Sequence, residues 1–216
     1  MDIFAAQAAP RRRLLTGTGI IGIGYTLSWI AGLSIAAPSP RFTASGAEIT
    51  TALAGHGTAV AAQFALTEGL PAAGLAIVSI ALARAARGSG AVSTARFAAA
   101  AGMAAAAISF TQFVLGMALV GTTAPGNAHL LFDAVNRLDG VKMLALAVLG
   151  AAGAASLLLP RWLRYVGIAL AITITASGIV YLLLLPGLSD VAAAPALVLL
   201  LIFITGTGIV VRTASR

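Results

Sequence analysis

The sequence predicts an all-α integral membrane protein, a bundle of about six transmembrane helices. Of its 216 residues, 60% are hydrophobic and only 9% are charged, whereas ordinary globular domains contain roughly 25% charged residues. Several uncharged runs reach about 20 residues, the length that an α-helix needs to cross the hydrocarbon core of a bilayer. These runs are continuous and lack the alternating pattern of a membrane β-barrel.

Six apolar runs are candidates for membrane spans. We expect them at residues 14–36, 58–84, 97–121, 139–159, 162–185 and 192–211. Because lipid offers the backbone no hydrogen-bond partners, each span must be helical. Together they predict a single transmembrane domain over residues 14–211, with a basic cytoplasmic segment at 1–13 and a cytoplasmic tail at 212–216.

The first span follows three arginines, Arg11 to Arg13, an arrangement that also begins signal peptides. The apolar run from Leu14 to Ala37 exceeds the roughly 7 to 15 residues of a signal-peptide core. We therefore expect a retained first helix.

The first outer connection predicts a short helix. Ser45 followed three residues later by Glu48 is a capping-box pattern, which begins a helix that we expect to reach about Ala54. Gly55 and Gly57 then interrupt the helix before the second span.

A second short helix is predicted in the next outer connection, after Pro125. His129, Asp133 and Arg137 recur every four residues, so they share one helical face and stabilise it by their charges. We expect Gly140 to bend this helix where it enters the membrane.

Arginine positions predict the orientation. When six spans are threaded in turn, most arginines fall on one side, namely Arg11, Arg12, Arg13, Arg84, Arg87, Arg96, Arg161, Arg164, Arg212 and Arg216. The opposite side receives only Arg41, Arg137 and Lys142. We expect the chain in the inner (plasma) membrane. The positive-inside rule then places both termini in the cytoplasm.

The basic residues also indicate the type of genome that encodes the protein and the partners that it binds. Lys142 is the only lysine among 13 basic residues, a composition typical of GC-rich bacterial genomes. The arginines lie in short clusters beside apolar runs, not along one basic face. We therefore expect the lipid bilayer as a partner, and no nucleic acid.

Small residues predict one helix contact. The segment Thr-Gly-Thr-Gly-Ile occurs at residues 16–20 and again at 205–209, near the cytoplasmic ends of the first and sixth spans. Small residues let helix backbones approach closely, so we expect these two spans to touch there. An internal repeat is the alternative, but the first and fourth spans do not match as an inverted repeat requires.

Four spans have polar residues at a similar level in the outer third of the membrane. Counting about 1.5 Å per residue places Glu68, Gln112, Lys142 and Ser177 there. A charge at the membrane centre costs about 2.5–3.5 kcal/mol and usually faces the bundle interior or a watery cavity. An ion pair between Glu68 and Lys142 would lower this cost, and Pro71 is expected to kink the second span nearby.

These residues predict an outward-facing polar pocket. Its candidate acids are Glu68 and Asp139, and its candidate ligand-binding residues are Lys142, Gln112, Gln63, Tyr25, Trp29, Ser177 and Tyr181. Two simpler interpretations stay open. In one, Glu68 lies at the headgroups and Lys142 snorkels outward; in the other, the two form a structural ion pair without chemistry. The aromatic residues also suit anchoring at the membrane interface.

Several chemistries lack the residues they need. No cysteine is present, which excludes disulfides and thiolate metal sites. The chain has no phosphate loop, zinc-binding helix or nucleophile turn, so ATP hydrolysis is excluded. His56 and His129 match no compact metal-ligand spacing. We therefore expect no metal and no cofactor.

Three classes of function fit these observations. The first is a protein that binds or moves an apolar or amphiphilic small molecule, alone or as a homo-oligomer. The second is a membrane-embedded enzyme in which Glu68 or Asp139 donates a proton to a lipid-like or isoprenoid substrate; membrane-bound terpene cyclases are similar in size and multi-span character. The third is a non-catalytic subunit that packs against a protein partner through alanine and glycine.

Overall fold

The computed structural model describes residues 17–211, apart from the side chains of residues 189 and 190. The basic segment with Arg11 to Arg13, the first three residues of the expected first span and the tail at 212–216 lie outside the described residues. Within residues 17–211 all regular secondary structure is helical, which confirms the all-α prediction.

Five helical segments are long and apolar enough to cross a membrane. The first, Gly57–Gly88, consists of α3 (Gly57–Phe64), the π-helical turn η1 (Ala65–Gly69) and α4 (Leu70–Gly88). The others are α5 (Val92–Gly121), α6 (Pro125–Ala155), α7 (Arg161–Leu182) and α8 (Ser189–Val210). A shorter apolar helix, α1 (Gly17–Leu33), has 17 described residues. The protein is thus a multi-span helical membrane protein.

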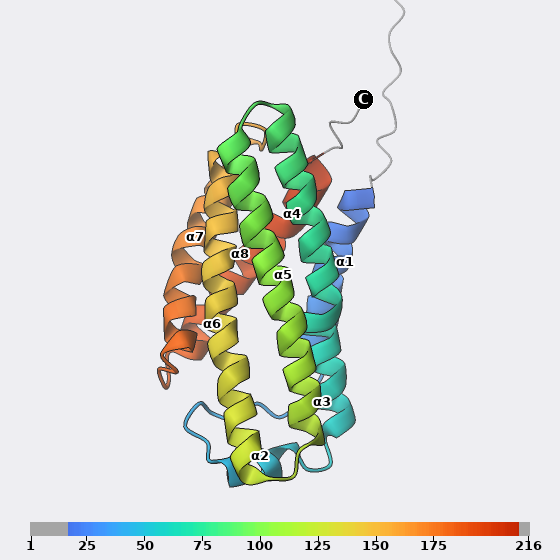
Figure 1. The fold of residues 1–216 in the computed structure, drawn as a ribbon, viewed down its shortest axis with the longest axis vertical. Helices are drawn as coiled ribbons and strands as arrows, with labels where there is room; N and C mark the ends of the chain where they lie inside the picture. The colour runs from blue at the N-terminus through green and yellow to red at the C-terminus, as the bar shows by residue number, and fades with distance from the viewer. Residues whose placement is uncertain (1–16, 212–216) are drawn as a thin grey trace, which may run out of the picture.

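The helices form a closed ring. From α4 to α8 each long helix packs against the next along the chain, and α1 closes the ring by packing against both α4 and α8 (Figure 1). The α4–α5 connection lies at the same end of the bundle as the end of α8, and α2 (Gly46–Leu53) lies at the other end. The ring therefore brings the first and last described helices together.

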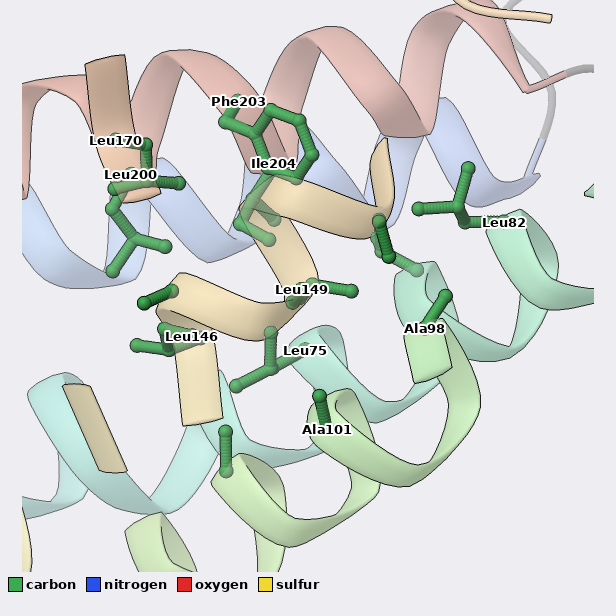
Figure 2. Packing of buried hydrophobic residues seen from close by; sticks show 14 of the residues in the cluster. Leu75, Leu82, Ala98, Ala101, Leu146, Leu149, Leu170, Leu200, Phe203 and Ile204 are labelled. Atoms are coloured by element: carbon green, nitrogen blue, oxygen red, sulfur yellow. The ribbon is translucent and has the colours of Figure 1, made fainter. Parts of the chain in front are cut away.

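A hydrophobic core fills the bundle. Figure 2 shows Leu75 of α4, Ala101 of α5, Leu146 of α6, Leu170 of α7 and Phe203 of α8 pointing into one cluster. Each of these side chains is at most 8% exposed. Many large apolar side chains on the outside of the ring are instead exposed, as expected of helices whose surroundings are lipid.

Close backbone contact joins α1 to α8, as the repeated glycine segments predict. A Cβ atom added at Gly208 would lie 2.6 Å from the carbonyl oxygen of Thr18, and one added at Gly22 would lie 3.2 Å from that of Ile204. The hydroxyls of Thr26 and Thr205 are 2.7 Å apart and add a polar contact between the same helices.

The fourth span differs from its prediction. We expected a separate short helix after Pro125 and a span beginning at residue 139, but α6 is continuous from Pro125 to Ala155. Its first part is stabilised by a small apolar cluster in which Ala128 packs with Ile49 of α2 and Leu119 of α5. Gly140 does not divide the helix: a Cβ there would lie 2.7 Å from the carbonyl oxygen of Gly178, so this glycine lets α6 and α7 approach closely.

The expected ladder of charges on α6 is present only in part. His129 and Asp133 lie 3.9 Å apart. Arg137 instead donates to the carbonyl oxygen of Leu182, at 3.0 Å, and so caps the end of α7, where a cation is favourable.

Helix α2 begins at the capping box that the sequence contains. The Ser45 side chain accepts from the backbone N–H of Glu48, while the Glu48 carboxylate accepts from the backbone N–H and the hydroxyl of Ser45. The two hydrogen bonds that the Glu48 carboxylate accepts from Ser45 hold the pKa of Glu48 below its usual range. Gly55, with φ +75°, then turns the chain into α3.

Candidate functional site

A π-helical turn brings Glu68 into the bundle. In η1 the N–H of Leu70 bonds the carbonyl of Ala65, one residue further back than in an α-helix. The same pattern would pair the carbonyl of Leu66 with residue 71, but Pro71 has no N–H. Ser28 of α1 supplies the missing donor through its hydroxyl, 2.6 Å from that carbonyl oxygen. A π-helical turn thus precedes Pro71, where the sequence predicted a kink.

Three charged side chains, Glu68, Asp139 and Lys142, form what we call the ion cluster. The ammonium Nζ of Lys142 lies 2.7 and 2.8 Å from the two carboxylate oxygens of Glu68 and 2.7 Å from Oδ1 of Asp139. Glu68 and Lys142 are 7% and 5% exposed. The ion pair that the sequence suggested is present, and Asp139 joins it from the same face of α6, three residues before Lys142.

Two side chains of α5 extend the ion cluster. Ser109 donates to Oε2 of Glu68. The amide nitrogen of Gln112 donates to the carbonyl oxygen of Val135, at 3.0 Å, and to Oδ1 of Asp139, at 3.3 Å. The amide oxygen of Gln112 is buried without a hydrogen-bond partner among the described residues. Groups from η1, α5 and α6 thus meet at one point.

The ion cluster contains two carboxylates and one ammonium group. Buried charges are tolerated when they are paired and hydrogen-bonded, and Glu68 satisfies this condition through Lys142 and Ser109. Asp139 is less enclosed, since its side chain is 19% exposed. With all three groups ionised, the net charge of the ion cluster is negative.

Two cavities meet at Asp139. The first, which we call the polar cavity, has a volume of about 260 Å³ and is lined by Glu68, Asp139, Gln112, Gln63, Asn136 and Tyr181, among others. The second, the apolar cavity, measures about 220 Å³ and is lined mainly by hydrophobic side chains, among them Trp29, Leu33, Met143, Ile174, Leu197 and Leu200. Asp139 and Tyr181 line both cavities.

A third cavity, of about 500 Å³, lies under the connection between α1 and α2 and adjoins the polar cavity. Both are lined by Pro40, Phe132 and Asn136. Tyr181 lines this cavity too, and its ring meets that of Phe42 edge to face, with centroids 5.2 Å apart. Tyr181 therefore borders all three cavities.

The other residues expected at the site have different surroundings. Tyr25 of α1 is 5% exposed and lies within electrostatic range of the ion cluster. Trp29 lines the apolar cavity and Gln63 lines the polar cavity. Ser177 is fully buried and donates to the carbonyl oxygens of Thr173 and Ala192. Its hydroxyl joins α7 to α8, and it is not among the residues that line the three cavities.

Ser109, Asn136 and Phe42 were not among the site residues predicted from the sequence. A signal existed for Ser109, which lies three residues before Gln112 and hence on the same helical face. Phe42 lies in a connection between helices, where no periodicity places a side chain. Within residues 17–211 no three histidine or acidic side chains lie close enough together to hold a metal ion.

The fold and the site define the class: a multi-span helical membrane protein with charged residues buried in its bundle. Comparison of the chain with family models, with curated proteins and with solved structures found no match. The chemistry of the described residues is therefore the basis for its function.

Proposed function

We propose that the protein spans the plasma membrane six times, with both termini in the cytoplasm. Helix α1 is the sixth span, because its 17 described residues alone are about 25 Å long at 1.5 Å per residue. Arg84, Arg87 and Arg96 lie around the connection between α4 and α5, at the end of the bundle opposite α2. The positive-inside rule makes that end cytoplasmic and turns the polar cavity outward.

In this membrane the protein binds an amphiphilic small molecule, or moves it. One observation supports this function above the others: a polar cavity and an apolar cavity share Asp139 and Tyr181 as common walls. A polar headgroup fits beside the ion cluster, and an apolar chain fits among the side chains of α1, α7 and α8. Ligand pockets typically combine a mainly apolar lining with a few placed polar groups in this way.

Native mass spectrometry of the gently solubilised protein tests the function, followed by organic extraction of whatever remains bound. Wild type is expected to retain an amphiphilic molecule. Ala193→Phe, which fills the apolar cavity, is expected to release it. The matched control is Ala194→Phe, one residue further along α8, which is exposed and is not among the lining residues.

Two outcomes of the same experiment contradict ligand binding. Detection of the wild-type chain without any bound small molecule would contradict the proposed binding of an amphiphile. Co-purification of a stoichiometric second protein without a small molecule favours a non-catalytic subunit of a membrane complex instead.

A membrane-embedded enzyme is the second candidate, and the exposure of Asp139 favours it. Lys142 and Ser109 donate hydrogen bonds to the carboxylate of Glu68, whereas Asp139 lines both the polar and the apolar cavity. Of the two acids, Asp139 is therefore the one that an isoprenoid or other lipid-like substrate can reach from both cavities. Conversion of the extracted molecule by wild type but not by a folded Asp139→Asn variant would identify an enzyme; conversion by both would remove Asp139 as the acid.

A further inference from the structure

The polar cavity offers hydrogen-bond acceptors to a ligand. The closest contacts of Asp139 with Lys142 and Gln112 are both made by Oδ1, and its side chain, 19% exposed, lines the cavity. The amide oxygen of Gln112 is buried without a partner among the described residues. Its partners set the orientation of the amide: the reversed amide would point an oxygen at the carbonyl of Val135 and at a carboxylate, both of which are acceptors.

Several donors around the same cavity are already engaged. The three N–H bonds of Lys142 match its three close acceptor oxygens, two on Glu68 and one on Asp139. The hydroxyl of Thr67 donates to the carbonyl oxygen of Gln63, and the amide nitrogen of Asn136 donates to that of Phe132. The side-chain amide of Gln63 makes no hydrogen bond with the described residues and is free to donate, but an anionic ligand beside it would also meet two carboxylates and one ammonium group.

We propose that the headgroup of the amphiphile is a protonated amine, held between Asp139 and Gln112. An ammonium group supplies donors to the unpartnered oxygen of Gln112 and to the carboxylate of Asp139, and its charge balances the second carboxylate of the ion cluster. This inference rests on the proposed function, because the attached apolar chain occupies the apolar cavity on the other side of Asp139. The ligand class is an alkyl or aryl amine.

Three matched probes test the headgroup: n-octylamine, n-octanol and n-octanoate. At pH 7 they are cationic, neutral and anionic with the same chain. The full chain with Trp162→Phe is placed in phosphatidylcholine vesicles, so that Trp29, in the wall of the apolar cavity, is the only tryptophan. Binding is followed by its fluorescence. We expect octylamine to bind at least about tenfold more tightly than octanol, and octanoate more weakly than both.

Asp139→Asn in the same background removes the excess carboxylate and keeps the side-chain shape. It is expected to reduce the preference for octylamine over octanol to about threefold or less. The control is Asp133→Asn, the same change on the same helix, at a residue that faces His129 and lines none of the three cavities. This control is expected to keep the wild-type preference. If Asp139→Asn does not fold, the order of the three probes on wild type decides the question alone.

The outcomes separate the two proposals. Equal binding of the three probes, or tightest binding of octanoate, overturns the amine headgroup but leaves amphiphile binding intact. An unchanged preference in folded Asp139→Asn also overturns it. Failure of all three probes to bind overturns both proposals. Weaker octylamine binding in phosphatidylethanolamine-containing vesicles supports a lipid amine as the natural headgroup, whereas unchanged binding supports a free amine.

Discussion

Lys142 is the only cation of the ion cluster, and its ammonium group contacts two carboxylates from different helical segments. Lys142→Met leaves Glu68 and Asp139 facing each other without a cation. Uncompensated buried charge typically costs about 3–5 kcal/mol. Glu68→Gln is expected to cost less, because Lys142 keeps its contact with Asp139. Both variants can be compared by unfolding in mixed micelles with increasing denaturing detergent.

A double variant, Glu68→Gln with Lys142→Met, is the control for this prediction. Since it removes one charge of each sign, it is expected to be more stable than Lys142→Met alone. Equal stability of Lys142→Met and Glu68→Gln would contradict the central role of the ammonium group.

At the residue scale, the sequence predicted which charges are buried but not the full set of partners. Glu68 and Lys142 stand out because each is an ionisable residue within an apolar run. Asp139 was assigned to the edge of a span, so its contact with Lys142 was not foreseen, although a spacing of three residues on one helix permits it. The unpaired oxygen of Gln112 depends on the positions of α5 and α6, which no local pattern fixes.

At the element scale, η1 depends on a donor from another helix. Ser28→Ala leaves the carbonyl of Leu66 without a hydrogen bond, because Pro71 cannot provide one. We expect a loss of about 1–3 kcal/mol in the free energy of unfolding, the usual cost of an unsatisfied buried acceptor. Thermal unfolding in detergent, followed by circular dichroism, measures it.

Two variants accompany Ser28→Ala. Ser34→Ala is the matched control, because Ser34 directly follows α1 and its exposed hydroxyl donates to the carbonyl of Ile30 in the last turn of that helix; it should change stability little. Adding Pro71→Ala to Ser28→Ala restores a backbone N–H near Leu66 and is expected to recover part of the loss. A Ser28→Ala protein as stable as wild type would mean that η1 does not need this donor.

Helix bounds were predictable where an apolar run ends at charged or turn residues. The span expected at 162–185 corresponds to α7, Arg161–Leu182, and that expected at 58–84 to Gly57–Gly88. The predicted start of the span in α6, residue 139, was wrong because hydropathy indicates only the part of a helix that lies in the membrane. Residues 125–138 are helical for another reason: Ala128 and Leu131 pack against the α2 end of the bundle. Such tertiary packing leaves little trace in one sequence.

At the scale of the whole molecule, the absence of native cysteine allows a direct test of orientation. Thr51→Cys in α2 and Ser89→Cys after α4 are exposed positions near opposite ends of the bundle. A membrane-impermeant maleimide is expected to label Thr51→Cys in intact cells, and Ser89→Cys only after the membrane is permeabilised. The reverse pattern would invert the topology and turn the polar cavity toward the cytoplasm.

The continuous course of α6 has a mechanical consequence. This one helix contributes Phe132 and Asn136 to the third cavity, Asp139 to the polar cavity, and Lys142, Met143 and Leu146 to the apolar cavity. Helix α6 is unbroken over 31 residues, so we expect these side chains to move together as one rigid unit. A small axial slide or rotation of α6 against α5 and α7 would reshape all three spaces together. Widening one of them by this motion changes the other two as well, which couples the cavity under the α1–α2 connection to the apolar cavity.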